Sequence, residues 1–105
     1  TNLSSEIFML EQLEKIATSL ERRLKKQNIA GKTVTLKIKY SDFSQQTRSK
    51  TVPYFIADKG LILENVKELL YQERMKDSVR LLGISLSNLN TEQKKTVVVQ
   101  LQFAF

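Results

Sequence analysis

One stretch of this chain constrains the fold more than any other: residues 33–40 alternate strictly between polar and apolar side chains. Because successive side chains of a β-strand point to opposite faces, this pattern predicts a half-buried strand. The expected core face carries Val34, Leu36, Ile38 and Tyr40, and the other face carries Thr33, Thr35, Lys37 and Lys39. Ser41 and Asp42 favour a turn, and residues 44–51 contain no aliphatic side chain. We therefore expect a hairpin with a core face and a polar, cationic outer face.

The segments around this hairpin predict two helices and a third strand. Apolar residues recur at helical spacing from Leu10 to Leu24, which predicts a helix from a cap at Ser5 to about Lys26. We expect Pro53 to end the second strand, because proline donates no ladder hydrogen bond. Asp58 is then the expected cap of a second helix over about 59–75.

The third strand is expected over 78–87, with Gly83 marking a bulge or a close backbone approach. Residues 88–95 are polar and are predicted to form a loose connection. The resulting fold class is α+β: an antiparallel sheet with two helices packed on one face.

The composition narrows the possible functions. The net charge is +6, and residues 32–50 hold five cations against the single acid Asp42. This concentration favours a polyanion partner, although a solvated basic face remains the alternative. The chain has no cysteine and no histidine, which removes thiolate chemistry, disulfides, most zinc sites and the usual general base. We predict no catalytic residue and no metal site, because no glycine-rich phosphate loop or nucleophile–base pair is visible.

No secretory leader and no apolar run of membrane-spanning length appears, so we expect a cytoplasmic protein without a membrane partner.

The outer face of the predicted sheet combines cations with hydroxyl groups, which is the chemistry of phosphate contact. Lys37, Lys39, Ser85 and Ser87 are expected there, together with either Thr47 and Ser49 or Arg48 and Lys50. None of these strand positions is aromatic, so binding to the backbone of duplex DNA is favoured over stacking on single strands.

Three motifs resemble a known family. Residues 40–43 (Tyr-Ser-Asp-Phe) are followed by residues 47–49 (Thr-Arg-Ser), and residues 78–84 read Ser-Val-Arg-Leu-Leu-Gly-Ile. Together with residues 20–24 (Leu-Glu-Arg-Arg-Leu), they resemble the little finger, or polymerase-associated domain, of Y-family translesion DNA polymerases, and most closely the bacterial ones. The similarity extends from about residue 10 to residue 89.

The resemblance implies a ferredoxin-like βαββαβ topology whose first strand is absent from this chain. It also implies a DNA-binding domain over 1–89 and a linker with a tail over 90–105. In this family the domain holds duplex DNA by its phosphates, while separate catalytic domains carry out nucleotidyl transfer during DNA repair. The fragment would then need no cofactor and have no polymerase activity, and Mg²⁺ would belong to the parent polymerase.

The resemblance places phosphate contacts at consecutive hairpin residues and along the strand from Val79 to Ser85. Taken with the outer-face residues, the predicted DNA-binding set is Lys37, Lys39, Thr47, Arg48, Ser49, Lys50, Arg80 and Ser85.

The family's first strand would lie inside the sheet, between the hairpin and the last strand. Without it, the chain would have a gap, a rearranged sheet or a substitute strand. We expect that residues 96–103, which are rich in β-branched side chains, can act as such a replacement strand. It would come from the same chain or, in a strand-swapped dimer, from a neighbour.

The extreme C-terminus carries a second candidate site. Its glutamine and apolar spacing resemble the hexapeptide with which bacterial polymerases dock on the sliding clamp. The corresponding residues are Gln100, Leu101, Phe103 and Phe105. The alternative is the apolar end of a strand.

Two other functions remain open from the sequence. A small ferredoxin-like phosphate-binding enzyme, such as an acyl-phosphate hydrolase, would need an arginine beside an asparagine, for which Arg48 and Asn88 are the candidates. A stand-alone protein-interaction module would act mainly through the tail.

Overall fold

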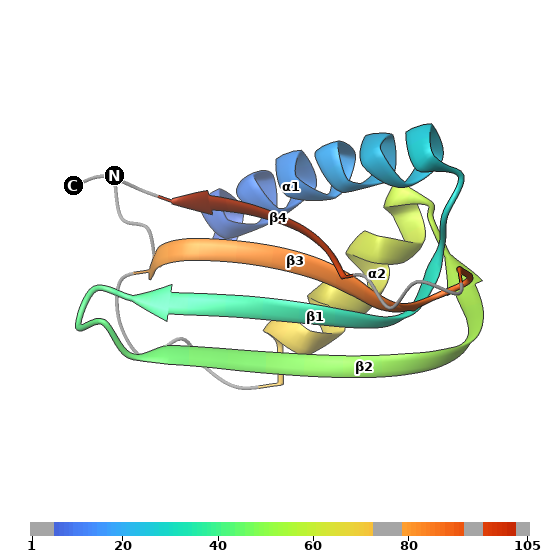
Figure 1. Cartoon of the computed structure of the whole chain (residues 1–105). Coiled ribbons are helices and arrows are strands. Elements are labelled where there is room, and N and C mark those ends of the chain that lie inside the picture. Colours follow the sequence, from blue (N-terminus) through green and yellow to red (C-terminus); the bar gives the residue numbers. More distant parts are fainter. Residues whose placement is uncertain (1–5, 73–78, 92–95, 103–105) are drawn as a thin grey trace.

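Six elements build the fold in this computed structural model, which describes residues 6–72, 79–91 and 96–102. They are α1 (Glu6–Gln27), β1 (Gly31–Tyr40), β2 (Gln45–Ile56), α2 (Lys59–Leu70), β3 (Val79–Leu89) and β4 (Val97–Gln102). The strands form one antiparallel sheet in the order β2-β1-β3-β4. Both helices cover the same face of this sheet (Figure 1). The predicted α+β class is confirmed.

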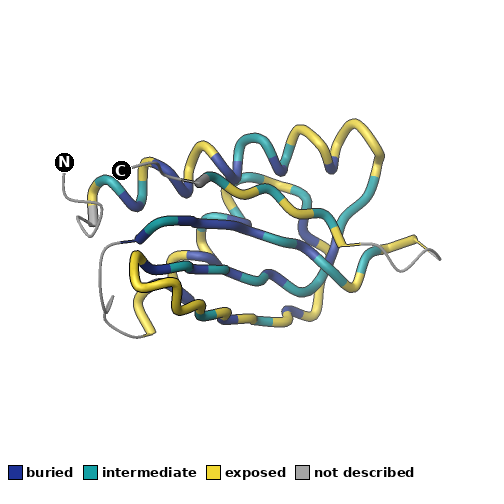
Figure 2. Tube along the Cα trace, turned by 60° about the vertical axis from the view of Figure 1, so that its left-hand side comes forward, coloured by how far each residue is buried: buried dark blue, intermediate teal, exposed yellow. Residues whose placement is uncertain are grey.

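The core lies between the sheet and the helices, as the alternation of β1 predicts. Its four apolar side chains, from Val34 to Tyr40, are at most 2% exposed. They meet the apolar stripes of α1 and α2, and buried positions recur along both helices and along β1, β2 and β3, whereas β4 contributes partly buried side chains (Figure 2). One face of the sheet is therefore committed to the core, and the other is open.

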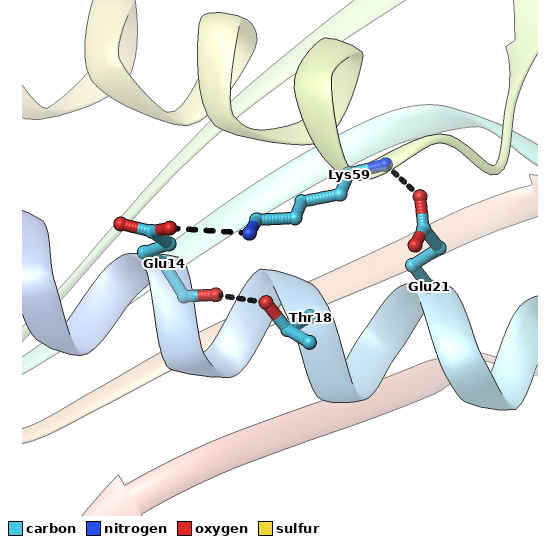
Figure 3. Close-up of polar contacts among 4 residues, drawn as sticks. All are labelled: Glu14, Thr18, Glu21 and Lys59. Carbon is cyan, nitrogen blue, oxygen red and sulfur yellow. Dashed lines mark hydrogen bonds and ion pairs between the residues drawn. The ribbon is translucent and has the colours of Figure 1, made fainter.

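The helix layer is fixed by polar contacts where α2 begins (Figure 3). The ammonium group of Lys59 lies 3.1 Å from Glu14 Oε1, and the Lys59 amide donates to Glu21 Oε2 at 2.6 Å. Asp58 caps α2 as predicted, because its side chain accepts from the Leu61 amide at 3.3 Å. The predicted cap of α1 at Ser5 lies outside the described residues.

Three predicted boundaries differ from the structure. Strand β2 continues through Pro53 to Ile56, because it is an edge strand and its pairing with β1 jumps from Thr33–Thr51 to Gly31–Ile56. A proline is tolerated in such an irregular edge segment. Helix α2 ends at Leu70, before the predicted boundary. Strand β3 extends to Leu89 beyond the predicted end, so the first two residues of the supposed loose connection are strand.

The sheet has no interior gap. Strand β3 pairs directly with β1, for example Leu36 with Ile84, so the expected position for a missing strand between them is wrong. The predicted replacement strand is confirmed over Val97–Gln102, and it pairs with the outer edge of β3 in the same chain. Gly83 marks a close approach rather than a bulge, since a Cβ there would lie 3.1 Å from Gln100 Cβ.

Arg48 ties the hairpin to the second helix. Its guanidinium group donates to the carbonyl oxygens of Leu69 at 2.8 Å and Leu70 at 3.0 Å, and to Gln46 Oε1 at 2.8 Å. The last carbonyls of a helix lack partners within the helix and form its negative end, so a buried cation suits this position. Arg48 is only 7% exposed and lies on the helix face. The expectation that its side chain contacts phosphate is therefore corrected.

Replacing Arg48 by alanine is expected to lower the free energy of unfolding by about 2–3 kcal/mol, because two helix-end carbonyls lose a charged donor. Urea denaturation of the purified chain measures this change. The control is Thr47→Ala at the neighbouring exposed position, where a change within about 0.5 kcal/mol is expected. Equal stability of the two variants would contradict the structural role of Arg48.

Candidate nucleic-acid interface

The open face of the sheet, away from the helices, is the candidate site. We call it the outer face; it comprises Thr33, Thr35, Lys37 and Lys39 of β1, Gln45, Thr47, Ser49 and Thr51 of β2, Leu81, Gly83, Ser85 and Ser87 of β3, and Val98 and Gln100 of β4. A shallow depression of about 230 Å³ lies in its middle. Since Gly83 has no side chain, backbone lies close to the surface at this point, and a ligand can approach the strand closely.

The register of β2 decides between the two alternatives that the sequence leaves open. Thr47 pairs with Lys37 and Ser49 pairs with Thr35, which puts both hydroxyl residues on the outer face. The hydroxyl groups of Thr35 and Ser49 lie 2.8 Å apart, and those of Thr33 and Thr51 lie 2.9 Å apart. These two pairs form a short row of hydroxyls along the β1–β2 ladder.

The predicted cations separate into two groups. Lys50 lies on the helix face, and its ammonium group pairs with Glu68 of α2. In the part of the chain that the structure describes, no ion pair involves Lys37 or Lys39. Within the described ranges, the positive charge of these two lysines is therefore not compensated by an ion pair, whereas the ion pairs found there involve the helices.

The far end of the outer face holds an aromatic residue that sequence reasoning did not select. Phe43 lies in the turn between β1 and β2 and is 66% exposed. Arg80 Cζ lies 4.7 Å from the centre of its ring, and Lys39 Nζ lies 5.9 Å from it. The sequence does contain a signal for this residue: Phe43 is an aromatic in a turn segment, where hairpin geometry does not require one.

The predicted clamp-binding residues are only partly described. Gln100 is exposed on the outer face, whereas Leu101 points to the other side and packs against the core. Arg23 of α1 donates to the Val98 carbonyl at 3.1 Å, which adds a contact between β4 and the helix layer. Phe103 and Phe105 lie outside the described residues.

The structure does not bring together the residues of the alternative phosphate-binding enzyme. The guanidinium group of Arg48 is bound to the end of α2 on the helix face. Asn88 instead donates to the Thr33 hydroxyl at 2.6 Å, beside the opposite face.

Among the described residues, no group of three acidic, histidine or cysteine side chains could hold a metal ion. None of the described helices is both long and apolar enough to span a membrane.

Fold and site define a two-layer α+β domain with an open, cationic, hydroxyl-rich sheet face. The sequence profile of the impB/mucB/samB family C-terminal domain matches residues 1–103, so the chain belongs to this family. This confirms the resemblance to the little finger of Y-family polymerases.

Several relatives carry the name DNA polymerase IV. The protein from Leptospira interrogans is 46% identical over 94 residues, which is 82% of this chain and 26% of the relative. The proteins from Clostridium perfringens and Bacteroides fragilis are 46% and 40% identical, over 77% and 90% of this chain. The chain spans about a quarter of the length of these relatives.

Proposed function

We propose that this domain binds the phosphate backbone of duplex DNA with its outer face, as an accessory domain of a translesion DNA polymerase. The parent would supply the catalytic residues and Mg²⁺, and it would act in the bacterial cytoplasm. The observation that carries the proposal is that Lys37 and Lys39, beside the hydroxyl row, form no ion pair with any of the described residues. The family of the chain and the names of its relatives support the same partner.

The hydroxyl row suits phosphate in particular. In a pair such as Thr35 and Ser49, one hydroxyl donates to the other, and the accepting hydroxyl keeps its own proton for a further partner. A phosphate oxygen is such a partner, and it accepts strongly because it carries charge. Lysines next to this row add attraction that does not depend on base sequence, because backbone contacts carry no sequence information directly.

A matched pair of lysine variants tests this proposal. Lys37→Ala is expected to weaken binding to all duplex sequences to a similar extent, and to reduce the slope of log affinity against log salt by about 1. Lys50→Ala removes the same charge from the helix face and is expected to leave that slope unchanged. Fluorescence anisotropy with random-sequence duplexes over a range of salt concentrations measures both. A larger loss for Lys50→Ala, or a loss limited to certain base sequences, would refute the proposed interface.

We further propose that the tail binds the sliding clamp when it leaves the sheet. Gln100 and Leu101 fit the glutamine and the first apolar residue of a clamp-binding peptide, but in β4 they point to opposite sides of the sheet. The docked strand therefore withholds Leu101, and clamp binding would require β4 to separate from β3. A tether of this kind raises the local concentration of the domain at DNA without adding DNA contacts.

Locking β4 onto β3 is expected to weaken clamp binding. Ser85 and Val98 are direct cross-strand partners on the outer face, and the chain has no cysteine of its own. The double variant Ser85→Cys, Val98→Cys can therefore be oxidised to an internal disulfide with no native thiol in competition. Its oxidised form should bind the clamp about tenfold or more weakly than its reduced form, since the competent state is removed.

Calorimetric titration with the clamp measures this difference, and a chain ending at Val99 serves as the control without the motif. Equal affinities of the oxidised and reduced forms, or of the intact and shortened chains, would count against the tail.

A further inference from the structure

The turn between β1 and β2 holds Phe43 in an unusual conformation. Its φ is 69°, in the left-handed region that bulky residues rarely adopt. The turn is nevertheless well tied: the Phe43 amide donates to the Tyr40 carbonyl at 3.0 Å, and the Ser44 amide donates to Asp42 Oδ1 at 2.9 Å. The Tyr40 amide also donates to the Ser44 carbonyl at 2.9 Å. Strained residues held by such surroundings concentrate at functional positions.

A bulge in β3 directs a cation toward the same ring. The pairing with β1 jumps from Lys39–Leu81 to Tyr40–Val79, which leaves Arg80 as the extra residue. Bulges commonly change the direction of one side chain, and here the guanidinium group lies 4.7 Å from the centre of the Phe43 ring. Lys39 reaches the ring from the outer face, with its ammonium group at 5.9 Å. The turn between β1 and β2, which we call the tip, lies at the left-hand end of the hairpin in Figure 1.

Packing does not explain this arrangement. Phe43 does not belong to the core, and 66% of its surface remains exposed although a guanidinium group lies against the ring. An open aromatic face with two adjacent cations suits a flat ring that carries negative charge nearby. A nucleotide has both features. Its base is accessible for stacking only when it is unpaired, since the bases of a duplex are already stacked on each other.

We propose that Phe43, framed by Arg80 and Lys39, stacks on an unpaired nucleotide of a DNA strand that continues from the duplex on the outer face. Lys39 belongs to both surfaces and makes them continuous. The strand positions of the outer face are not aromatic, so stacking is limited to the tip and to the first unpaired nucleotides beyond the duplex. This proposal rests on the proposed duplex binding and adds recognition of a single-stranded extension.

A tryptophan reporter tests the stacking directly. The chain contains no tryptophan, so Phe43→Trp introduces a single indole at the tip, which can be excited selectively over the tyrosines. A duplex with a short single-stranded overhang is expected to quench its emission, because the indole stacks on an unpaired base. A blunt duplex of the same paired sequence should bind with little quenching. Equal quenching by the two DNAs, or none by either, would overturn the proposal.

Affinities provide the second readout. Phe43→Ala is expected to weaken binding to the overhang duplex by about tenfold, and to leave binding to the blunt duplex unchanged. The control Tyr54→Ala removes another exposed aromatic from β2 and should affect neither DNA. An equal loss on both DNAs would instead place Phe43 in the duplex contact.

The two proposals fail separately. If the unaltered chain does not bind blunt duplex, the outer-face proposal fails. The contribution of Phe43 is then measured with a single-stranded oligonucleotide that has the sequence of the overhang strand. A loss of affinity in Phe43→Ala for that strand supports the stacking site, and unchanged affinity refutes it. Circular dichroism of each variant confirms that the fold is retained.

Discussion

Strand β1 hydrogen-bonds to a neighbour along both of its edges, and this double pairing decides what each face of the sheet presents. Its apolar side chains face the helices. The residues paired with them must therefore face the helices too, whether they are apolar, as Ile84 in β3, or polar, as Arg48 in β2. A shift of one residue in either partner would exchange core and surface side chains. The burial of Leu36 and Ile38 therefore also fixes Thr47, Ser49 and Ser85 on the outer face. The proposed DNA interface is thus a consequence of the hydrophobic core.

The sequence predicted the elements well where the pattern is local. Alternation along β1 and the apolar stripes of the helices each depend on neighbouring residues, and the structure confirms them. The sequence could not decide which of the two alternating sets of β2 side chains faces outward, Thr47 with Ser49 or Arg48 with Lys50. Residues 47–50 carry no apolar side chain that would mark the core side. The answer came from pairing with β1 and from α2, whose last carbonyls bind Arg48.

The remaining differences come from contacts between distant segments. Pro53 was expected to end a strand, but its place at an edge, in an irregular part of the register, depends on the order of strands in the sheet. Phe43 and Arg80 are 37 positions apart in the sequence, and a bulge in β3 brings them together. No local pattern announces such a bulge. The sequence likewise left open whether the apolar residues of β4 form the end of a strand or a clamp-binding peptide.

The position of duplex DNA on the outer face can be observed by nuclear magnetic resonance of the isotope-labelled chain during titration with a blunt duplex. If the outer face binds DNA, amide signals of Thr35, Lys37, Thr47 and Ser85 shift together, while those of α1 and α2 stay in place. The shifts are also expected to disappear at high salt, because exposed phosphate contacts are screened. Shifts concentrated on the helices, with the outer face unaffected, would contradict this position of the DNA.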